Sequence, residues 1–202
     1  DCIKENKINI RYIYQENGGQ HRALNHAIKE AKGELFMIVD SDDTLESIAL
    51  ERIAYYEKTI QDKTLFAGVS GLRKHFNGEI IGTPWPDHKN DFIDIKNTDR
   101  MKKRMLLGDK AEAYYTHVLR NFFPIPEFEG ENDVEKGVLW NRIASGGLRI
   151  RWFNEAIYNC EYLADGMSRN IIKNYLKNYN GYLLYIRELI HCDIGLYNKI
   201  KF

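Results

Sequence analysis

The first third of the chain alternates apolar runs of strand length with a segment of helical periodicity. Residues 8–14 alternate apolar and polar side chains and are rich in β-forming residues, which predicts a strand. In residues 22–32 the apolar side chains recur at helical spacing, and Gly33 stands where a helix commonly ends. Residues 35–39 form a continuous apolar run, as in a strand that is buried on both faces of a parallel sheet. Residues 65–70 predict a further strand.

A second helix is expected between the last two of these strands. Thr44 is a residue type that caps helices, and apolar residues recur at helical spacing from Ile48 to Ile60. The order strand, helix, strand, helix, strand therefore fills residues 8–72. This order predicts an α/β fold with a mostly parallel, Rossmann-like sheet flanked by helices. Because a doubly wound sheet normally has a strand and a helix before this point, we expect an N-terminally incomplete domain.

The second half of the chain gives weaker signals. A Tyr-rich apolar stripe at helical spacing follows residue 170 and predicts a C-terminal helical extension. We therefore divide the chain into a main domain, residues 1–168, and the extension, residues 169–202. The other expected elements are a short basic helix over residues 99–107, a strand over 113–119, a helix over 134–145 and strand structure over 148–160.

Composition narrows the class of protein. Of 202 residues, 44% are hydrophobic and 29% are charged, which supports a folded core and argues against disorder. The 29 Lys and Arg residues equal the 29 Asp and Glu residues, so a general nucleic-acid binder, which is usually basic, is disfavoured. No apolar run reaches the roughly 18 residues of a membrane span. The 3 scattered cysteines indicate reduced thiols in a cytoplasmic protein.

A cluster of three carboxylates, Asp40, Asp42 and Asp43, follows the apolar run directly. Ligands of open α/β sheets bind beyond the carboxyl ends of the strands, which is where this cluster is expected. The carboxylates repel one another unless a cation is present, and Mg²⁺ and Mn²⁺ prefer oxygen ligands. Alternation along the chain lets Asp40 and Asp42 point into one cleft. The alternative is a solvated loop in which Asp43 begins the next helix.

Three segments in order resemble family 2 glycosyltransferases of the GT-A fold, of the bacterial or archaeal type that builds cell-surface polysaccharides. Residues 16–47 (ENGGQHRALNHAIKEAKGELFMIVDSDDTLES) carry the family's helix and acidic motif. Residues 123–144 (FPIPEFEGENDVEKGVLWNRIA) resemble its acceptor-side segment, and residues 161–168 (EYLADGMS) resemble its Y-x-x-D-G-x-S motif. Together these matches extend over nearly the whole chain up to Ser168.

The resemblance implies a metal-assisted enzyme that transfers a hexose with inversion. Its donor would be a UDP-, GDP- or dTDP-sugar, its metal Mn²⁺ or Mg²⁺, and its acceptor a glycan or a lipid-linked sugar. Asp42 matches the main metal ligand, and Asp40 matches the residue that touches the ribose or the waters of the metal. We predict that Asp40, Ser41 and Asp42 together bind the nucleotide, and that Asp43 shapes the sugar site.

The general base is where the sequence departs from the family. The family's key carboxylate lies about four residues before the helix Trp, but the residue four before Trp140 is Lys136. We therefore expect the base to be Glu135, then Asp133, then Glu131. The alternative is that these acids only complement the positive end of the helix.

Further donor contacts are expected near the start of the first helix. Arg22 and Asn25 would meet the nucleotide there, and Gln15 and Asn17 would line its base pocket. Residues 165–168 would form a loop that closes over the diphosphate.

Two other functions and several partners stay open. The acidic cluster also fits a nucleotidyltransferase, and Lys136 at the expected base position also fits a non-catalytic sugar-nucleotide-binding domain. The mixture of Tyr and Lys in the extension fits contact with the inner face of a membrane, packing on the main domain, or a homodimer.

Overall fold

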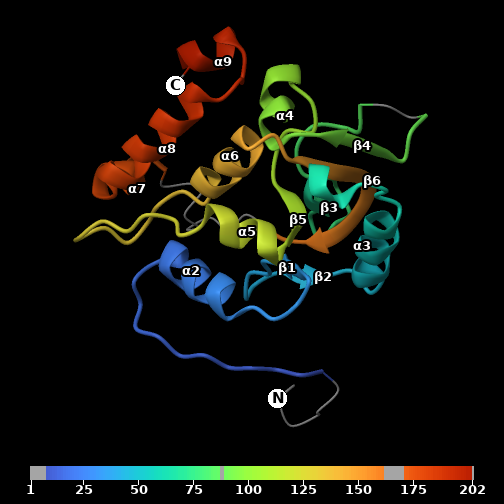
Figure 1. Cartoon of the computed structure of the whole chain (residues 1–202), viewed down its shortest axis with the longest axis horizontal. Coiled ribbons are helices and arrows are strands. Elements are labelled where there is room, and N and C mark those ends of the chain that lie inside the picture. Colours follow the sequence, from blue (N-terminus) through green and yellow to red (C-terminus); the bar gives the residue numbers. More distant parts are fainter. Residues whose placement is uncertain (1–7, 87–88, 162–170, 202) are drawn as a thin grey trace.

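The computed structural model describes residues 8–86, 89–161 and 171–201, and shows a curled sheet with helices on its faces (Figure 1). The strands are β1 (Leu35–Met37), β2 (Thr44–Leu45), β3 (Phe66–Lys74), β4 (Phe92–Ile95), β5 (Lys110–Tyr115) and β6 (Arg149–Asn159). The helices are α2 (Gln20–Glu30), α3 (Ala49–Lys58), the 3₁₀ turn η1 (Lys63–Leu65), α4 (Asn97–Lys103), α5 (Thr116–Phe122), α6 (Gly137–Ser145), α7 (Ile171–Lys177), α8 (Tyr179–His191) and α9 (Leu196–Lys201). The expected α/β class and the helical C-terminal segment are both present.

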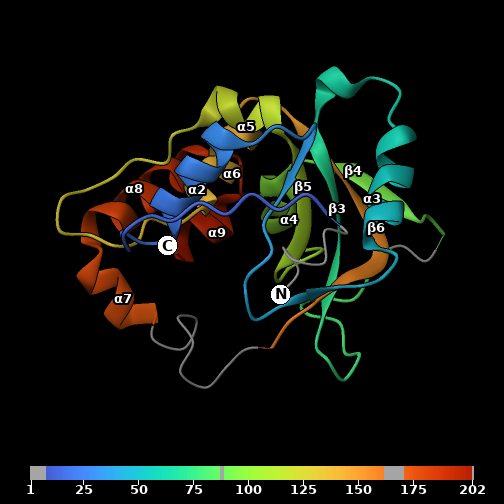
Figure 2. The same cartoon turned by 90° about the horizontal axis from the view of Figure 1, so that it is seen from below.

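The helices form layers around the sheet. Helix α3 packs on β3 and β6, while α5 packs on β5 and joins α2 to α6 on the other side (Figure 2). Helix α8 packs outside α6, where the Arg142 guanidinium meets the Glu188 carboxylate with Nη2 and Oε1 2.7 Å apart. None of the described helices is both long enough and apolar enough to cross a membrane. The C-terminal helices thus form a third layer beside the main domain.

The strand directions are mixed rather than mostly parallel. The order along the sheet is β1-β5-β3-β6-β2, with β4 also paired to β6. Among the described strands only β3 and β6 run parallel; the other pairs are antiparallel. The expected mostly parallel sheet is therefore wrong for this part of the chain. The strand expected over residues 8–14 is also absent, and Tyr12 and Tyr14 in this segment are each 76% exposed.

The strand before the acidic cluster is also shorter and more exposed than its apolar run predicts. Strand β1 has three half-buried residues and lies at the end of the described strand order, where β5 is its one neighbour. Val39, the last residue of the run, is 45% exposed. A strand with one neighbour is not covered on both sides, so the expectation of full burial is wrong for this strand.

Two expected elements begin or end at other residues than the sequence predicts. Thr44 pairs with Asn159 in β2 instead of capping a helix, and α3 begins only at Ala49. The expected strand over residues 113–119 ends at Tyr115 and continues as α5. The cause of the second division is tertiary: the Thr116 hydroxyl donates to the Gly33 carbonyl at 2.6 Å, and its amide donates to the Glu34 carbonyl at 2.9 Å.

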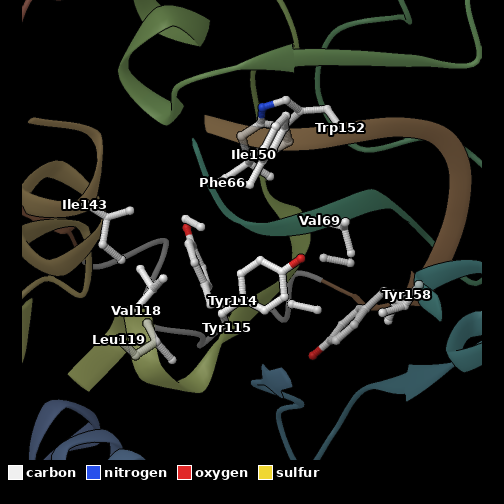
Figure 3. Close-up of a cluster of buried hydrophobic side chains, with 14 of the residues drawn as sticks. Phe66, Val69, Tyr114, Tyr115, Val118, Leu119, Ile143, Ile150, Trp152 and Tyr158 are labelled. Atoms are coloured by element: carbon white, nitrogen blue, oxygen red, sulfur yellow. The ribbon is translucent and has the colours of Figure 1, made fainter. Parts of the chain in front are cut away.

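The core lies between the sheet and the two helical layers. Trp152, Tyr115 and Tyr158 are among its largest fully buried side chains, and Figure 3 shows them converging with side chains of α5 and α6. Tyr56 of α3 stacks on Phe153 of β6 with ring centroids 4.3 Å apart. Burial of each large side chain contributes about 1.5–3 kcal/mol, so this cluster fixes the sheet from which the site loops extend.

Candidate active site

A cavity of about 610 Å³ opens at the end of β1, the strand that precedes the acidic cluster. The loop after β1, the segment of residues 133–137 and the loop before β5 all contribute to its lining. Side chains from α7 complete the rim. Residues that are more than 100 positions apart in the sequence therefore line the same cavity.

A buried tyrosine, Tyr158, forms two hydrogen bonds with the loop after β1. The Asp40 amide donates to the Tyr158 hydroxyl at 3.0 Å, and that hydroxyl donates to Asp43 Oδ2 at 2.7 Å. Tyr158 belongs to β6 and is fully buried. Burial and the nearby charges of Asp40 and Asp42 raise the pKa of Asp43, against the lowering effect of the Tyr158 hydroxyl. The Asp43 carboxylate thus accepts the hydrogen bond that joins this loop to β6.

All three carboxylates of the cluster line the cavity, and Asp40 and Asp42 are the two that do not bond to Tyr158 through their side chains. Asp40 accepts a hydrogen bond from Gln20 Nε2 at 3.3 Å, and Asp42 is exposed to solvent. The described part of the chain contains no group of three His, Cys, Asp or Glu residues placed to hold a metal ion. Two carboxylates nevertheless fit Mg²⁺, which usually takes one or two protein carboxylates and completes its shell with waters and substrate phosphates. Asp40 and Asp42 are therefore the residues that fit a cation together with a phosphate ligand.

Two basic side chains of the cavity lining, Lys110 and Arg100, bond to the loop before β5. Lys110 is fully buried, and its ammonium group donates to the Leu107 carbonyl at 2.9 Å and to the Ile81 carbonyl at 3.3 Å. Arg100 Nε donates to the Leu106 carbonyl at 2.8 Å. Burial, followed by the charge of Arg100, lowers the pKa of Lys110 to about 8. The sequence analysis did not select these residues, because their bonds to the backbone of residues 81 and 106–107 are visible only in the folded chain.

An aromatic pair also lines the cavity. Tyr114 of β5 stacks on Trp140 of α6, with centroids 4.3 Å apart and planes 10° apart. The Tyr114 hydroxyl is buried and makes no hydrogen bond within the described chain. A flat apolar wall beside polar groups suits a sugar ring, since its C–H face packs on an aromatic ring while its hydroxyls reach the polar groups.

The three base candidates are placed differently. Asp133 and Glu135 line the cavity, whereas Glu131 does not. Burial raises the pKa of Glu135, the charges of Asp133 and Asp109 raise it further, and Lys136 opposes them. Glu131 is buried and accepts hydrogen bonds from the Asn180 and Gly181 amides at 2.8 and 2.9 Å. These bonds outweigh the effect of burial and lower the pKa of Glu131. Glu131 is thus an anchor for α8, and Asp133 and Glu135 stay the candidates for the base.

The residues expected to contact the nucleotide from α2 do not line the cavity. Arg22 Nε donates to Glu127 Oε2 at 3.0 Å, and its Nη1 donates to the Glu131 carbonyl at 2.9 Å. Asn25 exchanges two hydrogen bonds with the backbone of Ile125, at 2.8 and 2.9 Å. Both side chains therefore fasten α2 to the segment after α5, and their part in donor binding stays a prediction.

The residues expected in the base pocket also lie outside the cavity. Gln15 Oε1 is 2.8 Å from His26 Nδ1, and Asn17 Oδ1 accepts from the Gly19 amide at 3.1 Å. Gln20, which the sequence analysis did not select, lines the cavity beside Asp40. The expected closing loop, residues 165–168, lies outside the described residues.

The fold resembles solved glycosyltransferase structures. S. aureus TarS in complex with UDP-GlcNAc superposes with a TM-score of 0.65 and 22% identity, over 98% of this chain and 55% of TarS as solved there. TarS in complex with UDP gives a TM-score of 0.57 and 21% identity, over 93% of this chain and 50% of the other. The chain thus spans about half the length of these relatives. The likeness confirms the expected GT-A fold.

Two comparisons of sequence complete the picture. No curated protein matches the chain. The family model described as glycosyl transferase family 2 matches residues 1–123, which include the acidic cluster, β3 and β5. Because this match covers more than half of the chain, the chain belongs to glycosyl transferase family 2.

Proposed function

We propose that this chain is the catalytic part of an enzyme that transfers a sugar from a nucleotide-sugar to a hydroxyl group of a glycan or lipid-linked acceptor, with inversion. The observation that carries the proposal is the single cavity that is lined both by Asp40 and Asp42 and by Asp133 and Glu135. TarS was solved with UDP-GlcNAc and with UDP, which favours a UDP-sugar as the first donor to test. GDP- and dTDP-sugars are the other donors to compare.

The donor side would hold the diphosphate. Asp40 and Asp42 are the residues that would bind Mn²⁺ or Mg²⁺, and the bound cation would neutralise the charge of the departing nucleoside diphosphate. Asp43 supports this side through its hydrogen bond with Tyr158. Tyr114 and Trp140 provide a flat surface beside the space for the transferred sugar.

The acceptor side would supply the base. The acceptor oxygen forms a bond to the anomeric carbon on the face opposite the diphosphate, and the bond from that carbon to the diphosphate oxygen breaks. The leaving nucleoside diphosphate keeps the electron pair, and the hydroxyl proton passes to the Glu135 carboxylate. A raised pKa makes Glu135 a stronger base than an ordinary glutamate.

The test measures binding and turnover together. Thermal melts with UDP, GDP and dTDP and their sugars, with and without Mn²⁺, identify the donor because a ligand of the folded state raises its stability. The preferred donor is then incubated with the chain, and release of nucleoside diphosphate is followed. The proposal expects Mn²⁺-dependent stabilisation and turnover. If no nucleotide-sugar stabilises the chain, the donor site is refuted.

A non-catalytic sugar-nucleotide-binding domain is the second candidate. The observation that favours it is Lys136, which lines the cavity next to Glu135 and occupies the place expected for the base. Such a domain would bind the donor but release no nucleoside diphosphate, whatever acceptor is offered. A nucleotidyltransferase would instead release pyrophosphate from a nucleoside triphosphate and a sugar phosphate.

Location and assembly are further parts of the proposal. An acceptor in cell-surface polysaccharide assembly would place the enzyme in the cytoplasm at the inner face of the membrane. The outward side of α7 and α8 carries exposed Ile172, Leu176 and Leu183, and Lys173 and Lys177 lie beside them. Apolar side chains next to lysines suit peripheral membrane contact, and a homodimer would be the alternative partner. Flotation with vesicles and the mass in solution distinguish the two.

A further inference from the structure

The acidic wall of the cavity has little regular structure of its own. Residues 131–136 form neither helix nor strand and connect the segment after α5 to the start of α6. A segment of this kind is held in place only by the groups that bond to its backbone. The C-terminal helices α7 and α8 supply several of those groups, and the Arg22 guanidinium of α2 supplies one more at the Glu131 carbonyl.

Asn178, between α7 and α8, binds the backbone of the acidic wall directly. Its side chain is buried, and its Oδ1 accepts from the Asn132 amide at 2.9 Å and from the Asp133 amide at 3.1 Å. Its Nδ2 donates to Asn174 Oδ1 at 2.9 Å and to the Asn174 carbonyl at 3.0 Å. One side chain thus joins two successive amides of the wall to the last turn of α7.

Asn174 continues this connection to a carboxylate. Its Nδ2 donates to Asp133 Oδ2 at 2.5 Å, and both side chains line the cavity. The Asp133 charge in turn raises the pKa of Glu135. The contacts therefore lead from α7 to Asp133, and the charge of Asp133 acts on Glu135 two residues further along the chain.

Close packing at two glycines leaves the wall little freedom to move. A Cβ at Gly181 of α8 would lie 2.7 Å from the Asp133 carbonyl oxygen. A Cβ at Gly137, at the start of α6, would lie 2.7 Å from a ring carbon of Tyr185. Glu131, at the other end of the segment, binds the first amides of α8. The wall and the extension fit together at both ends.

We propose that Asn178 and Asn174 are positioning residues, which fix the backbone at residues 132–133 and aim Asp133 and Glu135 at the acceptor. The inference rests on the proposed function, since it assigns these carboxylates to the acceptor side. The Asp40–Asp43 loop is held by Tyr158 and by none of the described residues of α7–α9. Loss of the two asparagines therefore lowers turnover and leaves donor binding intact.

The main variant is Asn178→Ala in the whole chain, with UDP-GlcNAc and Mn²⁺ as the probe. We expect kcat for UDP release to fall about 10- to 100-fold, since a displacement near 1 Å in an active site costs up to about 100-fold. The KM for UDP-GlcNAc stays within about twofold of the original, because the donor wall is untouched. Amide hydrogen exchange at Asn132 and Asp133 becomes faster, because both amides lose their acceptor.

The matched control is Asn198→Ala in α9. Asn198 Nδ2 also donates to two carbonyls, those of Met101 at 2.9 Å and Ile194 at 2.7 Å, but Asn198 does not line the cavity. This control keeps the original kcat, KM and exchange at residues 132–133. Asn174→Ala is the second variant and serves if Asn178→Ala does not fold. It lowers kcat with the same unchanged KM.

The outcomes separate this inference from the function on which it rests. An unchanged kcat in both asparagine variants overturns the positioning role, and so does an equal loss in Asn198→Ala. A parallel loss of donor affinity assigns the effect to general destabilisation and also overturns it. If the original chain releases no UDP at all, the proposed function fails for this donor. The exchange rates at Asn132 and Asp133 then decide the positioning role alone, and unchanged rates overturn it.

Discussion

The two walls of the cavity are supported by different parts of the molecule. The donor wall, residues 40–43, rests on Tyr158 in the longest strand of the sheet, in the centre of the core. The acidic wall, residues 131–136, rests on side chains and amides of α7 and α8, outside the sheet. The comparison teaches that the sheet supports the proposed donor side of the cavity, while the C-terminal helices support the proposed acceptor side. Changes in one support are therefore expected to leave the other wall in place.

The largest effect expected on the donor wall comes from Asp40→Asn together with Asp42→Asn. Loss of both carboxylates removes the cation and the diphosphate, and we expect turnover to fall about 1,000-fold, as for loss of a major electrostatic contact in other enzymes. Stabilisation by UDP with Mn²⁺ disappears in thermal melts. Glu51→Gln, which changes an exposed carboxylate on α3, is the control and keeps both properties. Retained stabilisation in the double variant would remove these residues from the donor site.

A smaller effect is expected when the hydrogen bonds between the donor wall and Tyr158 are removed. Tyr158→Phe deletes the hydroxyl that joins Asp40 to Asp43, and an unpaired buried group costs about 1–3 kcal/mol. We expect a loss of that size in the free energy of unfolding and about a tenfold rise in the KM of the donor, as one charge-assisted bond is lost. Denaturant titration and steady-state kinetics measure the two.

The matched control for that variant is Tyr115→Phe. Tyr115 is equally buried, but its hydroxyl donates to Glu57 Oε1 at 2.9 Å, and it does not line the cavity. We expect Tyr115→Phe to lower the free energy of unfolding by a similar amount, while the KM of the donor stays unchanged. An equal rise of KM in both variants would mean that the donor wall depends on the core as a whole and not on Tyr158.

A shift in pH dependence tests the acidic wall. The base acts when ionised, so kcat rises as the pH passes the pKa of Glu135, which burial and the charge of Asp133 hold above its ordinary value. In Asp133→Asn the second cause is absent, so the acidic limb of the kcat profile moves to lower pH. Asp193→Asn, in an exposed ion pair with Lys102, leaves the limb in place. A limb that moves to higher pH, or not at all, would exclude Glu135 as the titrating base.

The smallest effect on turnover is expected at Arg22. Its guanidinium donates to three carbonyls and to Glu127 but does not line the cavity. Arg22→Ala is therefore expected to cost about 1–3 kcal/mol of stability, because the carbonyls lose their donor. Because Arg22 does not line the cavity, the KM of the donor should stay within about twofold of its original value. A tenfold higher KM would show that Arg22 contacts the nucleotide, as the sequence analysis predicted.

The sequence located the acidic cluster, which lines the cavity, better than the elements around it. Asp40 and Asp42 were identified because carboxylates directly after an apolar run form a local pattern, and periodicity located α2, α6 and β6 with shifted ends. Strand direction was predicted wrongly, because the pairing of β1 with β5 joins residues that are far apart in the chain. No local pattern reports such a pairing.

The supports of the two walls were beyond prediction for the same reason. Asn178 bonds to a residue 46 positions away, and Tyr158 bonds to one 118 positions away. Asparagine in a helical stretch ordinarily indicates only a weak helix former, and tyrosine in a strand only a β-former. Their functional meaning depends on contacts that exist only in the folded chain.

One measurement tests the division of labour between the two walls most directly: donor binding and turnover of Glu135→Gln beside the original chain. The account predicts that UDP-GlcNAc with Mn²⁺ stabilises both proteins equally, while UDP release falls about 1,000-fold in the variant, within the range for loss of a general base. Glu129→Gln, which changes an acid of the same segment that does not line the cavity, should keep full turnover. Full turnover in Glu135→Gln, or loss of donor binding together with turnover, would contradict the account.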